Sequence, residues 1–434
     1  MALSIPEKDL QLIRDYLDKN PNLDFYCPLP FSHFSSSPDG RYKPCCVAKA
    51  SPYTTKDKSP LEFFNSDVME DLRRDMREGQ ITDHVIDYCK RCLITEAQSG
   101  HSKRIEEIKK NGRTYDTDKF NSIKLKLFGN FCNLKCVMCA PLQSSKWAAE
   151  VIEHGALTVS DPEVPEASRA EIAHATAWPI RDFPVEKSIL SPFSVMDKDK
   201  FYRDMEYIVP RLKKLECTGG EPLINEDVLE FIRWIIKKGW NKTLSLKFVT
   251  NGTCFAKDLT FLGQFKKVRF SISVDGVGPR GEYLRYGTKW AQLKENIQRY
   301  RRIKNLQVVG NTCITALNIG YLDEIFEFFE SVEVPFKLSN ILVGPRYLRA
   351  LNLPNGIKAR YREKLEKTKW RDQMGIALRI LEMEEDLPQF RTMVRYLEAL
   401  DLRRKTSLEA LWPEFYEFLR AAEKPSREPA AVTG

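Results

Sequence analysis

The sequence predicts an α/β protein in which a partial, TIM-like barrel of six parallel strands follows a cysteine-rich N-terminal region and precedes a helical extension. Three observations lead to this fold class. Strand-like and helix-like segments alternate from about residue 121 to residue 345, which is the pattern of a parallel sheet with helical crossovers. Eight of the 11 cysteines stand in tight groups before residue 140. Residues 350 to 423 have a helical and basic character.

The N-terminal region is expected to span residues 1–115. Helical periodicity is present in DLQLIRDYL and in SDVMEDLRRDMREG, with Ser66 as the N-cap of the second helix and Gly79 as its end. Loops rich in Pro, Ser and Gly carry the first cysteines. Charges interrupt the apolar positions of the first 17 residues, so no signal peptide is expected. No apolar run reaches the roughly 20 residues of a membrane span, and a soluble, cytoplasmic protein is expected.

The barrel is expected to span residues 116–345. Its strands are predicted in SIKLKLFGN, KKLECTGG, LSLKFVTNG, KVRFSISVDG, QVVGNTCIT and FKLSNILVGP, and its helices in NEDVLEFIRWIIKKG, KWAQLKENIQRYRRI and YLDEIFEFFESV. A proline-rich, polar insertion occupies about residues 155–195, either as a flap over the site or as a solvated loop. Residues 346–434 form the helical C-terminal extension, whose last residues, KPSREPAAVTG, are expected to be disordered.

Composition leaves the partner open. The chain has 434 residues, of which 42% are hydrophobic, and a net charge of +8. This basic surplus is compatible with an anionic substrate or with nucleic acid, but it is too diffuse to decide between them. Cysteines separated by two and three residues in a cytosolic protein indicate metal ligands rather than disulfides.

Three cysteines, Cys132, Cys136 and Cys139, follow the first predicted strand with the spacing CxxxCxxC. Thiolates hold iron–sulfur clusters, and a [4Fe–4S] cube normally takes four of them. Three ligands leave one iron open to a small molecule, as catalytic zinc keeps one position free. The alternatives are a zinc knuckle or reactive thiols, but zinc prefers four ligands and no histidine lies near in the sequence. We therefore expect a redox cluster with a vacant iron at the barrel mouth.

The chain here resembles the radical S-adenosylmethionine (SAM) enzymes, over about residues 121–345. CxxxCxxC at the first strand of a partial (β/α)6 barrel is their signature, and TGGEP resembles their GGEP segment. The resemblance implies that Gly219 and Gly220 let the backbone approach the SAM amine and that Glu221 supports this contact. TNG closes the third strand, as in relatives. The residue before the third cysteine is usually aromatic and lies near adenine; here it is Met138, whose thioether can also pack on a purine.

Further SAM contacts are implied by the same resemblance. The strand-end positions that contact the ribose in similar proteins are here Ser271, Ser273 and Asp275. Asn311 on the fifth strand and the turn after Leu342 stand where the family often touches SAM. Alternating serines are also the ordinary polar face of a strand, so each position taken alone is a weak signal.

A second cysteine set precedes the barrel. Twelve residues separate Cys27 from Gly40, and four more separate Gly40 from Cys45. This spacing resembles the opening of SPASM and twitch domains, which bind auxiliary clusters, and Cys89 and Cys92 complete four ligands. A helix over residues 93–110 is expected beside them. In most relatives this module follows the barrel, which leaves its orientation open. Cys46 competes with Cys45, and a zinc site with four cysteines is the alternative.

Several isolated residues have an ordinary structural interpretation. His33 in an aromatic loop is interpreted as packing rather than as a ligand. Cys217, Cys254 and Cys313 are interpreted as small hydrophobes in strands, with a substrate-quenching role for Cys217 as the alternative. Arg285 either anchors an anionic substrate or is a surface arginine.

The resemblance implies reductive cleavage of SAM to a 5′-deoxyadenosyl radical that abstracts hydrogen from a substrate carbon. The substrate is expected to be a peptide or protein side chain or a small metabolite, and the reductant an external flavodoxin- or ferredoxin-type one-electron donor. The auxiliary [4Fe–4S] cluster is expected to accept an electron, to shuttle electrons or to brace the fold. Two alternatives remain: modification of a nucleotide or nucleic acid, and a non-catalytic iron–sulfur or zinc protein that binds a partner or carries electrons.

Overall fold

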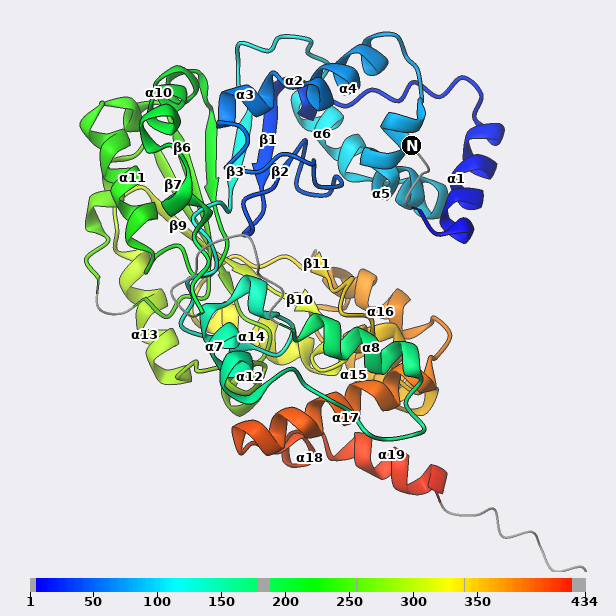
Figure 1. Cartoon of the computed structure of the whole chain (residues 1–434). Coiled ribbons are helices and arrows are strands. Elements are labelled where there is room, and N and C mark those ends of the chain that lie inside the picture. Colours follow the sequence, from blue (N-terminus) through cyan, green and yellow to red (C-terminus); the bar gives the residue numbers. More distant parts are fainter. Residues whose placement is uncertain (1–4, 178–187, 255–256, 339, 424–434) are drawn as a thin grey trace, which may run out of the picture.

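A computed structural model describes residues 5–177, 188–254, 257–338 and 340–423 of the chain. Its centre is a seven-stranded sheet in the order β2-β1-β3-β5-β6-β7-β9 (Figure 1). The strands from β1 to β9 are parallel, and only the edge pair β1–β2 is antiparallel. The strands are β1 (His33–Ser36), β2 (Tyr42–Lys43), β3 (Ser122–Leu125), β5 (Lys214–Cys217), β6 (Ser245–Thr250), β7 (Lys267–Ser273) and β9 (Leu306–Asn311).

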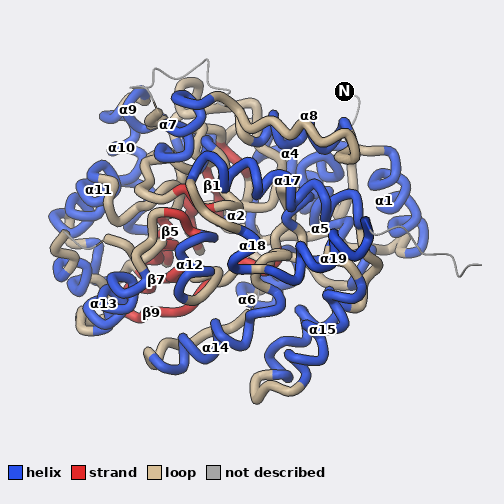
Figure 2. The backbone as a smooth tube through the Cα atoms, turned by 90° about the horizontal axis from the view of Figure 1, so that it is seen from below, coloured by secondary structure: helices blue, strands red, loops and turns tan. Residues whose placement is uncertain are grey.

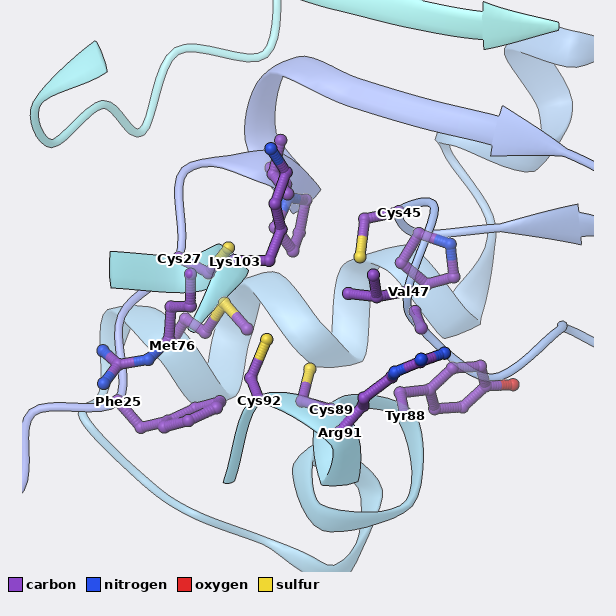
Figure 3. Close-up of a pocket in the computed structure, with 15 residues that line it drawn as sticks. Phe25, Cys27, Cys45, Val47, Met76, Tyr88, Cys89, Arg91, Cys92 and Lys103 are labelled. Atoms are coloured by element: carbon purple, nitrogen blue, oxygen red, sulfur yellow. The ribbon is translucent and has the colours of Figure 1, made fainter. Parts of the chain in front are cut away.

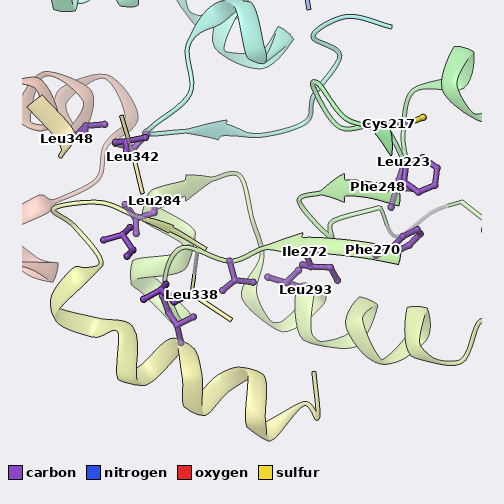
Figure 4. Packing of buried hydrophobic residues seen from close by; sticks show 14 of the residues in the cluster. Cys217, Leu223, Phe248, Phe270, Ile272, Leu284, Leu293, Leu338, Leu342 and Leu348 are labelled. Atoms are coloured by element: carbon purple, nitrogen blue, oxygen red, sulfur yellow. The ribbon is translucent and has the colours of Figure 1, made fainter. Parts of the chain in front are cut away.

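Crossover helices cover one face of this sheet. They include α10 (Lys198–Ile208), α11 (Glu226–Lys237), α13 (Trp290–Arg301) and α14 (Leu322–Ser331), and α10, α11 and α13 lie together on one side of the strands (Figure 1). Phe248, Phe270 and Ile272 of the sheet and Leu293 of α13 belong to the same buried core (Figure 4). Alternation of apolar and polar residues along each strand therefore gives the sheet one helix-covered face and one polar face. The predicted α/β class and parallel barrel are confirmed.

The sixth predicted strand does not join the main sheet. β11 (Asn340–Ile341) pairs in parallel with β10 (Cys313–Ile314), which continues the chain beyond β9. The main sheet thus ends at β9, and β10 and β11 form a separate two-stranded sheet.

The N-terminal region is built onto the barrel. β1 pairs with β3, the first barrel strand, so the sheet continues into this region. Its helices are α1 (Glu7–Lys19), α2 (Leu29–Ser32), α3 (Pro60–Phe64), α4 (Asp67–Arg77), α5 (Asp83–Ser99) and α6 (Lys103–Asn111), which share a small core of their own. The continuous helix expected over residues 93–110 is wrong. Gly100 has φ +65° and ends α5, and Ser102 caps α6 by accepting a hydrogen bond from the Ile105 amide.

The insertion is only partly a loop. It contains α8 (Glu166–Ala175) and α9 (Pro192–Val195), while residues 178–187 lie outside the described residues. Ser168 of α8 accepts a hydrogen bond from Gln389 Nε2 of α17 (Leu387–Arg404) at 3.1 Å. A helix docked on the C-terminal extension contradicts the solvated loop over this part, and the flap stays a prediction.

The C-terminal extension is helical, as predicted. It comprises α15 (Asn355–Glu366), α16 (Gly375–Leu381), α17 (Leu387–Arg404), α18 (Leu408–Leu411) and α19 (Pro413–Glu423); the tail expected to be disordered lies outside the described residues. The view from below shows the strands surrounded by helices (Figure 2). None of the described helices has the length and apolar character of a membrane span.

Candidate active site and second cysteine centre

The CxxxCxxC loop is held in a defined conformation at the carboxyl end of β3. Within it, β4 (Lys135–Cys136) pairs antiparallel with β8 (Arg285–Tyr286), so that Cys136 faces Arg285. Cys132 and Cys136 are buried, Cys139 is half-buried, and the three belong to one apolar cluster with Met138. The structure therefore brings together the three cysteines and Met138, as the motif implied.

The first turn of α7 (Ser145–His154) forms hydrogen bonds with the backbone of this loop. Ser145 Oγ accepts a hydrogen bond from the Cys132 amide and donates one to the Cys132 carbonyl, both at 3.1 Å. Trp147 Nε1 donates to the Cys136 carbonyl at 2.9 Å. Because each bond goes to a cysteine's own backbone, the backbone at Cys132 and Cys136 is positioned independently of any bound group.

The C-terminal extension clamps the same loop from the other side. Arg404 Nη1 donates to the Lys135 carbonyl at 2.9 Å, and its guanidinium forms a buried ion pair with Glu150 of α7. Tyr396 Oη donates to the Val137 carbonyl at 3.1 Å. Sequence reasoning missed both residues, which lie about 260 positions from the loop and belong to no motif.

A positive charge lies beside the three thiols. The Arg285 guanidinium pairs with Asp275 Oδ2 at 2.5 Å, and neighbouring Cys136 and Asp275 raise its pKa although burial opposes this. A hydrogen bond from the Cys139 thiol lowers the pKa of Cys136, whereas burial raises the pKa of Cys132 to about 12. Arg285, whose side chain is 14% exposed, is thus a half-buried partner of the cysteine loop, and not the surface arginine considered as the alternative.

The TGGEP segment packs directly against the cysteine loop. Gly219 and Gly220 have φ +100° and +56°, and a Cβ on Gly220 would lie 2.2 Å from the Phe131 carbonyl oxygen. The Glu221 amide donates to that carbonyl at 2.7 Å. Only glycine allows both the left-handed backbone and this close approach.

Glu221 connects TGGEP to the TNG turn. Its fully buried carboxylate accepts hydrogen bonds from Thr250 Oγ1 at 2.7 Å and from the Asn251 amide at 2.5 Å. Asn251 in turn donates to Asn133 Oδ1 at 2.9 Å and lies 4.0 Å from Cys132 Sγ. Asn251 was not singled out from the sequence, although the TNG motif that contains it was recognised. Burial raises the pKa of Glu221, and three hydrogen bonds to its oxygens act against that rise.

The other predicted SAM-contacting residues gather at the ends of β7 and β9. Asn311 Nδ2 donates to Ser273 Oγ at 3.3 Å, and Ser271 lies two residues before Ser273 on the same face of β7. Both Asp275 carboxylate oxygens are occupied, one by Arg285 and the other by the Cys313 amide at 2.9 Å. Leu342 follows β11, and its amide donates to Ile314. The structure brings these residues to one edge, and their contact with SAM stays a prediction.

The second cysteine set surrounds one cavity. Cys27, Cys45, Cys89 and Cys92 line a small cavity of about 20 Å³ together with Phe25 and other apolar groups (Figure 3). Cys89 and Cys92 are one turn apart on α5, which places both thiols on one helix face. Cys46 is exposed and does not line this cavity.

The donor set of each centre consists of cysteines, the residues that hold iron–sulfur clusters. Two buried and two half-buried thiols around an apolar cavity match the ligands of a closed cube, and three thiols match a cube with one open iron. Burial raises the pKa of Cys27 and Cys89, and that of Cys45 to about 12, so a cationic cluster would be needed to hold these groups as thiolates.

The remaining cysteines have structural surroundings. Cys217 and Cys254 are buried in the main core, and Cys254 Sγ contacts the Leu223 carbonyl at 3.3 Å. Cys313 is half-buried at the start of β10. None of the three lines the second cysteine cavity. The interpretation as small hydrophobes fits all three positions.

The fold and the site together are typical of one class of α/β protein. A parallel α/β partial barrel carries a three-cysteine loop, a glycine segment and an asparagine turn at the carboxyl ends of successive strands, where enzymes of this architecture hold their ligands.

Residues 127–329 match the radical SAM superfamily, and this chain carries a radical SAM domain. The family's [4Fe–4S] cluster and SAM are the cofactors that this domain implies.

Known proteins are similar over parts of the chain. The GTP 3′,8-cyclase of Bradyrhizobium diazoefficiens is 31% identical over 93 residues, which cover 21% of this chain and 26% of that protein. The GTP 3′,8-cyclase of Aquifex aeolicus is 23% identical over 158 residues, covering 36% and 47%. The solved structure of native anSMEcpe with bound AdoMet is 14% identical with a TM-score of 0.35, covering 59% of this chain and 62% of that one. The matches thus span about a quarter to a half of the curated relatives.

Proposed function

We propose that this chain is a radical SAM enzyme whose catalytic cluster is held by Cys132, Cys136 and Cys139. The observation that carries the proposal is the convergence of these three thiols at the carboxyl end of β3, beside the TGGEP and TNG segments. When bound, the cluster and SAM supply a 5′-deoxyadenosyl radical that abstracts hydrogen from a substrate carbon. The protein's own part is to bind, orient and exclude water.

The surrounding residues support that role. Gly219 and Gly220 bring an open backbone to the loop, and Glu221 holds this segment against the TNG turn. Arg285 lies among the thiols and offsets the negative charge that three thiolates bring to a buried place. Ser271, Ser273 and Asn311 provide hydroxyl and amide groups for the ribose of SAM.

The second centre, held by Cys27, Cys45, Cys89 and Cys92, is proposed to bind an auxiliary [4Fe–4S] cluster. Four cysteine ligands leave no open iron, which suits electron transfer rather than substrate binding. With an external flavodoxin- or ferredoxin-type donor for the first cluster, this second cluster would accept an electron from the substrate, making the reaction a net oxidation. A four-cysteine zinc site is the alternative that metal analysis excludes or supports.

Two substrate classes are candidates. The first is a peptide or protein side chain or a small metabolite. A nucleotide is the second candidate, favoured by the partial similarity to two GTP 3′,8-cyclases and by the net charge of +8.

The test is anaerobic reconstitution followed by SAM cleavage. Iron analysis should give about eight irons per chain for two cubes, and reductant plus SAM should release 5′-deoxyadenosine. A variant with alanine at Cys132, Cys136 and Cys139 should lose that release and about half of the iron. Cys254→Ala, a change at a buried cysteine outside both centres, is the matched control. Zinc without iron in the wild type, or undiminished 5′-deoxyadenosine in the triple variant, would contradict the proposal.

A further inference from the structure

A row of basic side chains crosses the polar face of the central sheet. Register pairs Lys43 with Ser35, Ser35 with Lys124, Lys124 with Glu216, Glu216 with Lys247, and Lys247 with Arg269. Paired residues on neighbouring strands point to the same side. Strands from two regions of the chain thus bring into line residues that are far apart in the sequence.

More basic residues flank this row on the same face. Lys214 and Lys267 precede the row by two residues on β5 and β7, and Lys126 follows it by two residues beyond Lys124. Successive residues on one face of a strand are about 6.6 Å apart, and neighbouring strands about 4.8 Å apart. The face therefore carries a compact field of cations, formed by Lys43, Lys124, Lys126, Lys214, Lys247, Lys267 and Arg269.

One carboxylate faces this field from the strands. Glu216 accepts contacts from Lys124 at 2.8 Å, Lys247 at 3.1 Å and Lys214 at 3.9 Å. Burial would raise the pKa of Glu216, but these lysines lower it to about 2. A single negative charge shared by three lysines leaves an excess of positive charge on the face.

Lys126 adds a cation without a carboxylate partner. In the part of the chain that the structure describes, no acidic oxygen forms an ion pair with its ammonium group. Burial and the neighbouring Lys124 and Lys43 lower its pKa to about 8. A Cβ on Gly219 would lie 3.2 Å from Lys126 Cβ, so Lys126 is at the end of the field next to the TGGEP segment.

The field opens into a groove between the sheet and α6. One part of the groove is lined by Lys124, Lys214, Glu216 and Lys247 from the sheet, with Lys103, Glu107 and Lys110 of α6 and with His33 and Cys46 of the N-terminal region. A second part continues to Lys267 and Arg269. On the α6 side, Lys103 pairs with Glu107 at 2.7 Å, so that glutamate does not neutralise the sheet lysines.

Two buried polar groups on this face lack partners. His33 Nδ1 lies 2.7 Å from the Ser122 carbonyl oxygen and therefore carries the proton, which leaves Nε2 as an acceptor. Nε2 is buried and has no hydrogen-bond partner, and the same is true of Ser35 Oγ in the basic row. Native proteins rarely leave such groups unpaired, so a water molecule or a ligand hydroxyl in the groove can supply the missing bonds.

We propose that this groove binds the phosphate groups of a phosphorylated substrate that also carries hydroxyl donors, as a nucleotide does. The lysines and Arg269 would hold the phosphoryl oxygens, and a ligand hydroxyl would donate to His33 Nε2. Several cations from adjacent strands match the dense charge of a phosphate chain, whereas carboxylates along an extended peptide face one side only every about 6.6 Å. That the ligand is the substrate rests on the proposed function; that it binds here does not.

The test is equilibrium binding to the reconstituted full-length protein, with saturating SAM and no reductant so that the nucleoside site of SAM is filled. GTP is the first probe, inorganic tripolyphosphate lacks the hydroxyls, a single-stranded RNA presents the same phosphates in a polymer, and a glutamate-rich peptide presents carboxylates. GTP should bind more tightly than tripolyphosphate and the peptide. RNA binding that exceeds that of GTP would identify nucleic acid as the source of the same phosphate chemistry.

The groove variant Lys247→Met/Arg269→Met should weaken GTP binding at least about tenfold, because each lost charge-assisted contact accounts for about that factor. The control is Lys237→Met/Lys294→Met, which removes two exposed lysines from α11 and α13. If the groove variant melts abnormally, Lys267→Met gives the same test, since Lys267 lines the groove and has no ion pair among the described residues. Tighter binding of the peptide, no binding of any phosphate probe, or unchanged GTP affinity in the groove variant would overturn the proposal.

The two proposals fail separately. GTP binding that depends on the groove in a protein that never cleaves SAM would leave the groove and reject the radical function. SAM cleavage in a protein that binds no phosphate probe would support the radical function and reject the phosphate-binding groove.

Discussion

Replacing Arg404 by methionine tests whether the C-terminal extension holds the catalytic loop. The Arg404 and Glu150 side chains are 2% and 4% exposed, and three nitrogen–oxygen contacts of 3.1 to 3.3 Å join them. The guanidinium also lies 4.6 Å from the Trp147 ring centroid and donates to the Lys135 carbonyl. Methionine keeps much of the length and removes the charge and every hydrogen bond.

The expected cost follows from burial. Removing one partner of a buried ion pair typically costs about 3 to 5 kcal/mol, because the other charge remains buried. Here Lys135 Nζ also contacts Glu150 and stays in place, so we expect the lower end, about 3 kcal/mol. Burial would raise the pKa of Glu150, but Arg404 and Lys135 hold it below its ordinary value; the variant should move that pKa upward.

The assay is urea unfolding of wild type, Arg404→Met and Arg404→Met/Glu150→Gln, followed by iron retention under a chelator. The double variant should be more stable than the single one, since it removes the stranded carboxylate charge. Arg403→Met, which loses contacts to the carbonyls of Gly155 and His154, should cost less than about 1 kcal/mol. A loss below about 1 kcal/mol for Arg404→Met, or a double variant no more stable than the single one, would refute the clamp.

Three further predictions concern individual positions. Cys45→Ser should remove about four irons per chain, whereas Cys46→Ser should keep these irons because Cys46 lies outside the cavity. Iron and sulfide analysis of the two variants tests this prediction. Loss of iron in Cys46→Ser but not in Cys45→Ser would contradict the ligand assignment. Gly220→Ala should lower the urea midpoint and the SAM affinity more than Gly278→Ala does. Both glycines have φ +56°, but a Cβ on Gly278 meets nothing within 4 Å. Equal losses in the two variants would argue against the close approach of Gly220 to the cysteine loop. GTP affinity should fall as the pH rises through about 8, because Lys126, at the end of the basic field, loses its proton and charge there. Lys126→Arg should remove this dependence because arginine stays charged. A flat wild-type titration would show that the charge of Lys126 does not contribute to GTP binding.

The sequence predicted the strands and the catalytic cysteines well for a local reason. Alternating apolar residues identify a half-buried strand without knowledge of its neighbours, as in β3 and β6. The spacing of Cys132, Cys136 and Cys139 is a property of one loop, and three ligands on so short a loop meet in most of its compact conformations. For the same reason α4, α11 and α13 lie where periodicity predicted them.

The misses depend on contacts between distant parts of the chain. α8 is short and polar, and docking against α17 stabilises it, so composition alone indicated a loop. The break at Gly100 was missed because glycine within a helical pattern is often tolerated. By contrast, the spacing predicted Cys45 rather than Cys46, and Cys45 is the one that lines the cavity.

By itself the sequence determined the fold class, the cysteine loop and the resemblance to radical SAM enzymes, because each is carried by residues close together in the chain. The grouping of the four N-terminal cysteines was predicted from their spacing, and the structure places them around one cavity. Tertiary structure alone decided that Arg404 and Tyr396 hold the catalytic cysteine loop and that lysines of five strands form one field. The physical reason is sheet register: hydrogen bonding between strands fixes which distant residues point to the same side, and no local pattern contains that information.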